Sequence, residues 1–148
     1  EVRALYTSDW HSETNGSFKK NGGIWPVHCV AGFEGAALDP SFARDIKWSA
    51  NRPSKENLFL KGLRDDVEEY SAFHGVNAEG KALHDVASSH VYVGGIASEY
   101  CVKETVLSLL QSGRSVTLLV PGLGWVAEEG HKKALAELKG LGALLVEA

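Results

Sequence analysis

Short apolar runs separated by helical patterns make up the hydrophobic pattern of this chain. The runs are rich in β-branched and aromatic residues, are bounded by turn-forming or charged residues, and predict strands at 2–7, 58–60, 91–93, 116–120 and 143–146. Because these runs are almost continuously apolar and do not alternate cleanly, they are typical of strands in a parallel sheet that is covered on both faces.

Two helical patterns lie between the predicted strands. Apolar side chains recur at helical spacing through residues 98–112, and Gly113 follows where a helix commonly ends. A second amphipathic pattern covers residues 127–139. Strands that alternate with helices in this way predict an α/β fold with right-handed crossovers.

The composition fits one globular domain and limits its partners. The chain has 148 residues, of which 44% are hydrophobic, so it is long enough to bury a core. A net charge of −4 without a basic stripe argues against binding of nucleic acid or of a membrane surface. Only two cysteines are present, Cys29 and Cys101, which fits a reducing compartment. We therefore expect a cytoplasmic protein, and the sequence leaves open whether it is a monomer or a homo-oligomer.

A long segment from Asp9 to Pro40 carries the first candidate site. It is rich in Gly, Asn, Ser and Pro and exceeds the roughly 15 residues of ordinary connections, which indicates a functional loop. Asp9 and His11 stand two residues apart at the end of the first predicted strand, so their side chains can point the same way. His28, returned by the loop, could complete a carboxylate and imidazole set of the kind that binds Zn, Fe or Mn. The spacing alone leaves another interpretation open, in which Asp9 caps the next segment and both histidines hydrogen-bond within the loop.

Cys101 follows a predicted strand and a small-residue turn, at the start of the first predicted helix. If Ser98 is the N-cap, the thiol lies in the first helical turn, where free N–H groups and the helix dipole favour a thiolate. The same N–H groups could stabilise an oxyanion after attack on a carbonyl carbon. The alternative is that Cys101 faces inward and packs as a small hydrophobic residue.

Lys61 ends the apolar run at residues 58–60. In a parallel sheet it would lie at the same edge as Asp9 and Cys101, where it could lower the pKa of the thiol or carry a proton. Lysines at strand ends are more commonly solvated, so this role needs support from elsewhere in the pattern.

Five short motifs, in this order and spacing, resemble the nicotinamidase and pyrazinamidase branch of the isochorismatase-like hydrolases: Asp9–His11, Gly22–Val30, Lys61–Gly62, Tyr70–Phe73 and Gly95–Val102. The resemblance covers essentially the whole chain. It implies a three-layer α-β-α fold with a mainly parallel central sheet, in one isochorismatase-like domain spanning residues 1–148.

The resemblance also implies an activity. A metal-dependent cysteine amidohydrolase of this kind converts nicotinamide, and also pyrazinamide, to the acid and ammonia, in NAD salvage. Cys101 would attack the amide carbon and form a thioester that water hydrolyses, with Lys61 as the catalytic lysine. The implied cofactor is one divalent metal ion, Zn before Fe or Mn, held by Asp9, His11 and His28.

Further residues match the family pattern. The resemblance implies a cis peptide bond at Ile96–Ala97 and an oxyanion hole formed by the N–H groups of Ala97 and Cys101. It places Trp25 and Tyr70 beside the planar ring of the substrate, for which offset stacking and edge contacts are suited.

The chain departs from the family pattern in two places. Asn15, or Ser17 under a different loop length, holds a place where many members carry a further histidine, so no fourth metal ligand is assigned. The family's N-terminal strand, which carries the catalytic Asp, and the helix after it have no counterpart, which predicts about 40 further residues in the natural protein. Two other functions stay open: a metal-free relative acting on another small amide or carbamoyl compound, and a non-catalytic binding protein on the same fold.

Overall fold

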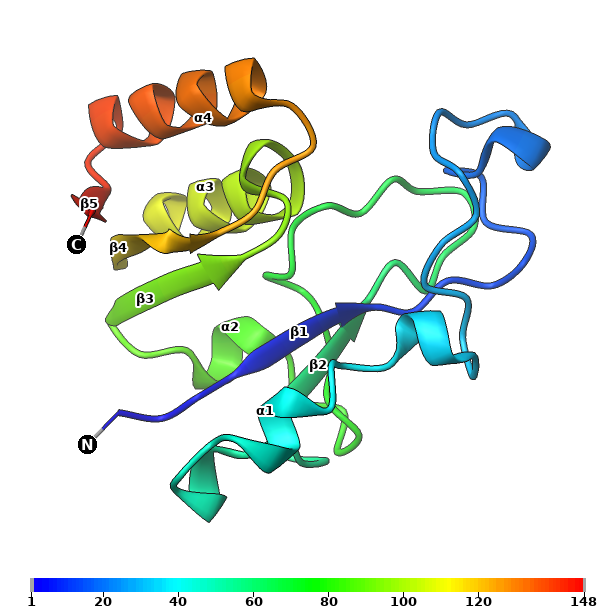
Figure 1. Ribbon diagram of the computed structural model, residues 1–148, viewed down its shortest axis with the longest axis horizontal. Coiled ribbons are helices and arrows are strands. Elements are labelled where there is room, and N and C mark those ends of the chain that lie inside the picture. The colour runs from blue at the N-terminus through cyan, green and yellow to red at the C-terminus, as the bar shows by residue number, and fades with distance from the viewer. Residues whose placement is uncertain (1, 148) are drawn as a thin grey trace. The chain divides into compact units, whose positions relative to one another are not determined.

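A computed structural model of the chain describes residues 2–147 (Figure 1). The chain forms two compact units. Unit 1 comprises the chain up to Glu69 together with His74–Leu83, and unit 2 comprises Tyr70–Phe73 together with the chain from His84 on. In the part of the chain that is described, no helix is both long and apolar enough to cross a membrane.

Two parallel strands form the centre of unit 1. β1 (Tyr6–Asp9) pairs with β2 (Leu58–Lys61), in a register that places Tyr6 opposite Leu58 and Asp9 opposite Lys61. Phe59 of β2 is completely buried, and Leu60 also pairs with Val76 through an isolated antiparallel bridge. Because β1 and β2 run in the same direction and end in register, their last side chains emerge at one edge of the sheet.

The connection between β1 and β2 contains only short helical turns. These are η1 (Lys19–Asn21), η2 (Glu34–Ala36), α1 (Ser41–Arg44) and η3 (Ser49–Asn51). Isolated bridges join His11 to Val30 and Phe18 to Trp25, so the loop folds back on the end of β1. Phe18 is completely buried, and its burial anchors the loop although the loop has no long regular element.

Unit 2 is built on three parallel strands and two longer helices. The strand order is β3 (His90–Gly95), β4 (Ser115–Leu123) and β5 (Leu144–Val146), with α3 (Lys103–Gln111) and α4 (Glu128–Gly140) as the crossovers. Both crossovers step in the same direction across the sheet and such connections are right-handed, so α3 and α4 lie on the same face, as Figure 1 shows. The short helix α2 (Leu83–Val86) precedes β3.

The core of unit 2 lies between the sheet and these helices. Apolar residues of α3 at helical spacing meet buried residues of β4 and α4, and the fully or nearly fully buried members are Val102, Val106, Leu109, Val116, Leu118, Leu123, Leu138 and Ala143. Gly113 adopts a left-handed conformation with φ of 85°, which ends the chain's first long helical segment. The apolar positions that recur at helical spacing in the sequence are therefore the residues that pack in this core.

The predicted parallel α/β fold is confirmed, and every ladder between named strands in the described chain is parallel. The predicted strand at 2–7 is wrong in its bounds. β1 begins only at Tyr6, whose N–H donates to the Asn57 carbonyl, whereas the Ala4 N–H is taken by the side chain of Asn51. Apolar character alone does not make a strand, because ladder partners are also required.

The single helix predicted at 98–112 is also wrong. The segment begins with a π-helical turn, η4 (Ser98–Val102), and the α-helix starts at Lys103. Ala97 holds the N-cap position of η4, and no side chain makes a capping hydrogen bond there. The predicted N-cap, Ser98, is buried and its hydroxyl binds elsewhere in unit 2.

Candidate functional site

Unit 1 brings together four residues that the sequence singled out. The parallel register sets Asp9 beside Lys61 at the ends of their strands, and Lys61 Nζ lies 2.5 Å from Asp9 Oδ1. Lys61 is only 4% exposed and also donates to the Glu69 carbonyl at 3.1 Å. A buried ammonium is tolerable only when paired and hydrogen-bonded, so Lys61 is not the solvated strand-end lysine of the alternative interpretation.

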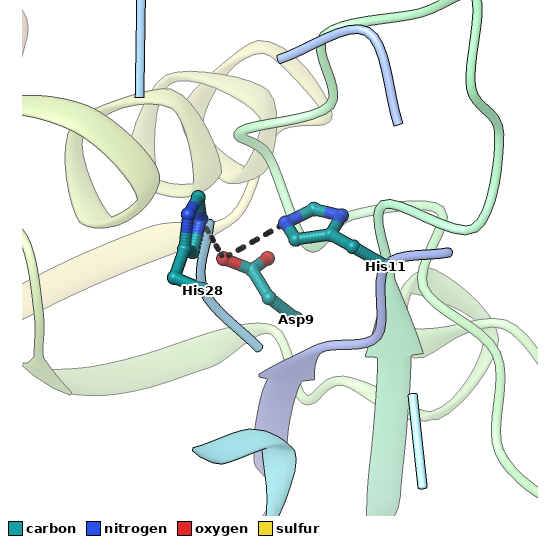
Figure 2. A group of neighbouring side chains, drawn as sticks. All are labelled: Asp9, His11 and His28. Carbon is teal, nitrogen blue, oxygen red and sulfur yellow. Dashed lines mark ion pairs between the residues drawn. The ribbon is translucent and has the colours of Figure 1, made fainter. Parts of the chain in front are cut away.

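Two histidines face the same carboxylate. The His11 N–H donates to the Cys29 carbonyl at 2.9 Å, which draws the returning loop against β1 and places His28 beside Asp9. Nε2 of His11 lies 3.7 Å from Asp9 Oδ2, and Nε2 of His28 lies 4.0 Å from the same oxygen (Figure 2). One possible ligand atom from each of the three residues lies within 4.8 Å of the others.

The other nitrogen of each imidazole ring is held by the backbone. Nδ1 of His11 lies 2.8 Å from the Gly62 carbonyl, and Nδ1 of His28 lies 2.7 Å from the Pro26 carbonyl. A carbonyl can only accept a hydrogen bond, so each Nδ1 carries a proton, and in the neutral ring the lone pair of Nε2 then faces Asp9. Backbone-held Nδ1 and free Nε2 are the arrangement of metal-binding histidines.

The donor set fits a divalent metal ion. Two lone pairs facing a carboxylate repel one another unless a cation lies between them. With bonds of about 2.0 to 2.1 Å, the ligand atoms of a tetrahedral zinc site are about 3.3 Å apart, so a contraction of less than about 1 Å would bring each imidazole into position relative to Asp9. One carboxylate and two imidazoles also leave coordination positions for water or substrate.

The charges in this cluster shift two pKa values in opposite directions. Burial by itself would raise the pKa of Asp9, but the contact with His11 and the charge of Lys61 outweigh burial and lower it to about 2. Burial would lower the pKa of His11, yet Asp9 and the Gly62 carbonyl outweigh it and the pKa is raised. The cluster therefore keeps Asp9 ionised, which is the form that binds a metal ion.

We expect acid to remove a part of the stability of the metal-free protein that depends on Asp9. The folded-state pKa of about 2 lies below the reference value of 3.8, so the stabilisation is complete above about pH 4 and is lost as the pH falls toward 2. The pKa difference corresponds to about 2 kcal/mol in the free energy of unfolding. Urea unfolding with a chelator between pH 5 and 2 measures it, with Asp9→Asn as the comparator that should lack this pH dependence. If the free energy of unfolding falls with pH equally for the wild-type protein and Asp9→Asn, the expectation is contradicted.

An aromatic wall fixes the two imidazole rings. The fully buried ring of Phe18 meets His11 edge-on at 5.6 Å and His28 at 5.3 Å between ring centroids. Trp25, predicted to contact the substrate, lies 6.4 Å from His28 in a similar edge geometry. Such contacts restrict ring rotation, so both Nε2 atoms stay directed at Asp9.

Asn15 and Gly62 fix the orientation of the His11 ring through the Gly62 carbonyl, and sequence reasoning did not assign them this role. The Asn15 amide is buried and donates to the Gly62 and Arg64 carbonyls at 3.2 Å each, while its oxygen accepts the N–H of Ser17 at 3.0 Å. Asn15 thus holds the carbonyl that orients His11. The Ser17 hydroxyl is buried and has no hydrogen-bond partner among the described residues.

Gly62 has a conformation and a setting that only glycine fits. Its φ is 70°, and an added Cβ would lie 2.3 Å from Cε1 and 2.6 Å from Nδ1 of His11. The absence of a side chain therefore lets the backbone reach the imidazole. The only sequence signal for this contact was a glycine directly after Lys61, at the end of an apolar run.

Unit 2 holds the remaining predicted residues. Cys101 is partly buried within η4, and the peptide bond between Ile96 and Ala97, just before that turn, is cis. The Ala97 carbonyl accepts the N–H groups of Tyr100 and Val102 at 3.0 and 3.1 Å, which closes the turn around Cys101. Tyr70 packs against Tyr100 at 5.6 Å between ring centroids.

Comparisons with known proteins give a consistent result. The family model described as the isochorismatase domain matches residues 2–148. A nicotinamidase of Escherichia coli is 31% identical over an alignment 163 positions long, which covers 95% of this chain and 73% of that protein.

Solved structures show the same likeness. The zinc complex of the pyrazinamidase of Pyrococcus horikoshii is 33% identical, with a TM-score of 0.79, and the match covers 99% of this chain and 76% of that one. PnC1 of L. infantum in complex with nicotinate is 31% identical, with a TM-score of 0.77, and the match covers 98% of this chain and 71% of that one.

Proposed function

Because the chain belongs to the isochorismatase domain family, we propose that it is an amide hydrolase that converts nicotinamide to nicotinate and ammonia. Its similarity to nicotinamidases and to a pyrazinamidase supports this substrate class, with pyrazinamide as a second substrate. The observation that carries the proposal is the cluster of Asp9, His11 and His28, in which Nε2 of both imidazole rings faces one carboxylate.

The cluster favours a heteroaromatic amide over other small amides. When bound, a divalent ion supplies a Lewis-acidic position for a ring nitrogen of the substrate. Asp9, His11 and His28 would hold that ion, and zinc is the first choice because a carboxylate with two imidazoles suits it. Lys61 pairs with the Asp9 carboxylate and balances its negative charge.

We assign the covalent step to Cys101. Its thiolate attacks the amide carbon, the carbonyl oxygen becomes an oxyanion, and the N–H groups of Ala97 and Cys101 stabilise it. The carbon–nitrogen bond then breaks, and the amine leaves as ammonia with the proton that the thiol gave up. Water hydrolyses the resulting thioester, which releases the acid and restores the thiol.

Three further assignments complete the proposal. Lys61 is the catalytic lysine by its match to the family pattern, and a buried ammonium of this kind can stabilise negative charge that develops on the substrate. Trp25 and Tyr70 contact the planar ring of the substrate, by their match to the family pattern and by the aromatic surroundings that each has in its own unit.

Ammonia release tests the proposal, with benzamide as a matched substrate that lacks the ring nitrogen. We expect the metal-loaded full-length protein to release ammonia from nicotinamide. Chelation should raise the KM for nicotinamide about 10-fold or more, a loss of about 1.4 kcal/mol in binding, and should change benzamide turnover little. No ammonia from nicotinamide would overturn the function, whereas equal effects of chelation on both amides would overturn the role of the metal site.

A further inference from the structure

The turn that carries Cys101 is tied to the segment before α4. The N–H of Ser98 donates to the Gly124 carbonyl at 2.8 Å, and the N–H of Gly124 donates to the Gly95 carbonyl at 3.0 Å. These backbone contacts leave little space, because a Cβ on Gly124 would lie 2.6 Å from Cγ2 of Ile96. The residues on either side of the cis peptide therefore pack directly on this segment.

Glu99 makes a second tie to the same segment. One oxygen of its carboxylate accepts the N–H groups of Val126 and Ala127 at 2.7 and 2.8 Å. Burial would raise the pKa of Glu99, but these backbone donors outweigh burial and the pKa is lowered, so the carboxylate is ionised. The start of α4 comes close as well, since a Cβ on Gly130 would lie 3.2 Å from Cγ of Glu99.

Ser98 and His131 make the third and most buried tie. Nδ1 of His131 lies 2.7 Å from the Ser98 hydroxyl oxygen, and both residues are buried. The hydroxyl also lies 3.3 Å from the other carboxylate oxygen of Glu99, which can only accept, and when the hydroxyl donates to that oxygen, Nδ1 of His131 is the donor to Ser98. The ring of Trp125 stacks on His131 at 4.3 Å and 22°, which fixes the imidazole plane.

We infer that His131 is a positioning residue for the nucleophile: through its hydrogen bond to Ser98, it holds the η4 turn in the conformation that presents the Cys101 thiol. The role follows from a mismatch between sequence and structure. A serine at the start of a helical turn ordinarily caps that turn, yet Ser98 makes no cap and its hydroxyl pairs with a histidine 33 positions later. The η4 turn is thus stabilised by a residue of α4 instead of by its own cap, and its conformation depends on the contact between Ser98 and His131.

The competing interpretation is that His131 is merely a core residue of α4. A structural role would show in stability alone, whereas a positioning role predicts a change in the reactivity of Cys101 in protein that stays folded. Misplacing a reacting group by about 1 Å can lower the rate by about 100-fold. The inference rests on the proposed thiol chemistry at Cys101.

Two substitutions at His131 separate these roles. His131→Phe keeps a ring to stack on Trp125 and removes the donor, whereas His131→Asn keeps an N–H donor near the position of Nδ1. We expect the Phe variant to lower kcat for nicotinamide about 10- to 100-fold with little change in KM, and to slow alkylation of Cys101 by iodoacetamide across the pH profile. The Asn variant should recover most of both rates.

Ser98→Ala should reproduce the effect of His131→Phe, and the double variant should be no slower than either single one, because both remove the same hydrogen bond. Ser112→Ala is the matched control. Its hydroxyl donates to the Leu109 carbonyl at 2.7 Å at the far end of α3, about 16 Å along the helix from Cys101. We expect this control to keep the wild-type kcat and alkylation rate.

The outcomes are distinguishable. Wild-type kcat and alkylation in His131→Phe, or an Asn variant as slow as the Phe variant, would overturn the positioning role. Alkylation needs no substrate, so a wild-type protein that releases no ammonia would refute the proposed function while the alkylation rates still decide the role of His131.

Discussion

Replacing Cys101 by alanine is expected to lower kcat/KM for nicotinamide by at least about 10⁴-fold, because the substitution removes the only atom that forms the proposed covalent bond to the substrate. The effect should fall on kcat, since Cys101 contributes to the chemical step. Steady-state ammonia release measures the loss, and substrate binding to the variant can be followed by calorimetry.

Cys29→Ser is the control for thiol loss. Cys29 lies in unit 1 with a φ of 47°, and its backbone carbonyl, which the substitution keeps, accepts the N–H of His11. We expect the Ser variant to retain activity within about threefold. Ammonia release by Cys101→Ala at the wild-type rate would exclude Cys101 as the nucleophile.

Replacing Gly62 by alanine is expected to weaken metal binding by about 100-fold or more, although Gly62 is not a ligand. A methyl group at this position would lie 2.3 Å from Cε1 of His11, so the imidazole must leave its position beside Asp9 and give up its hydrogen bond to the Gly62 carbonyl. Loss of such supporting contacts commonly lowers metal affinity about 10- to 100-fold, and the displaced ring adds to this. Competition with a chromogenic chelator measures the affinity directly.

Gly80→Ala separates the clash from backbone strain. Gly80 also lies in unit 1 with a φ of 78°, close to the 70° of Gly62, but an added Cβ there would meet nothing within 4 Å. Both variants should lose about 1 kcal/mol of stability from the left-handed conformation, and only Gly62→Ala should lose metal affinity. Equal metal affinity in the two variants would show that the approach of Gly62 to His11 does not matter for the site.

Some of the candidate site could be predicted from local sequence. Asp9 and Lys61 each lie close after an apolar run, and in-register parallel strands bring their last residues together, as the pairing of β1 with β2 shows. Asp9 and His11 were expected to act together because strand side chains repeat every two residues. His28 was a weaker expectation, since its approach depends on how the loop from Asp9 to Pro40 folds.

Other features had no local signal. The Asn15 amide reaches Gly62, 47 positions away, and the proton on Nδ1 of His11 is set by a carbonyl 51 positions away. Ser98 was expected to cap a helix and instead binds His131. Each of these contacts depends on the direction in which a distant backbone group points.

The sequence by itself determined the alternation of strands and helices, and it placed Asp9 and Lys61 close after apolar runs and Cys101 near the start of a helical segment. These follow from periods of two and 3.6 residues and from turn-forming residues, all of which act over a few neighbouring positions. The tertiary structure alone decided which nitrogen of each histidine faces Asp9, why position 62 must be glycine, and that α4 supports the Cys101 turn. Those features depend on hydrogen bonds and close packing between segments far apart in the chain, which local periodicity does not encode.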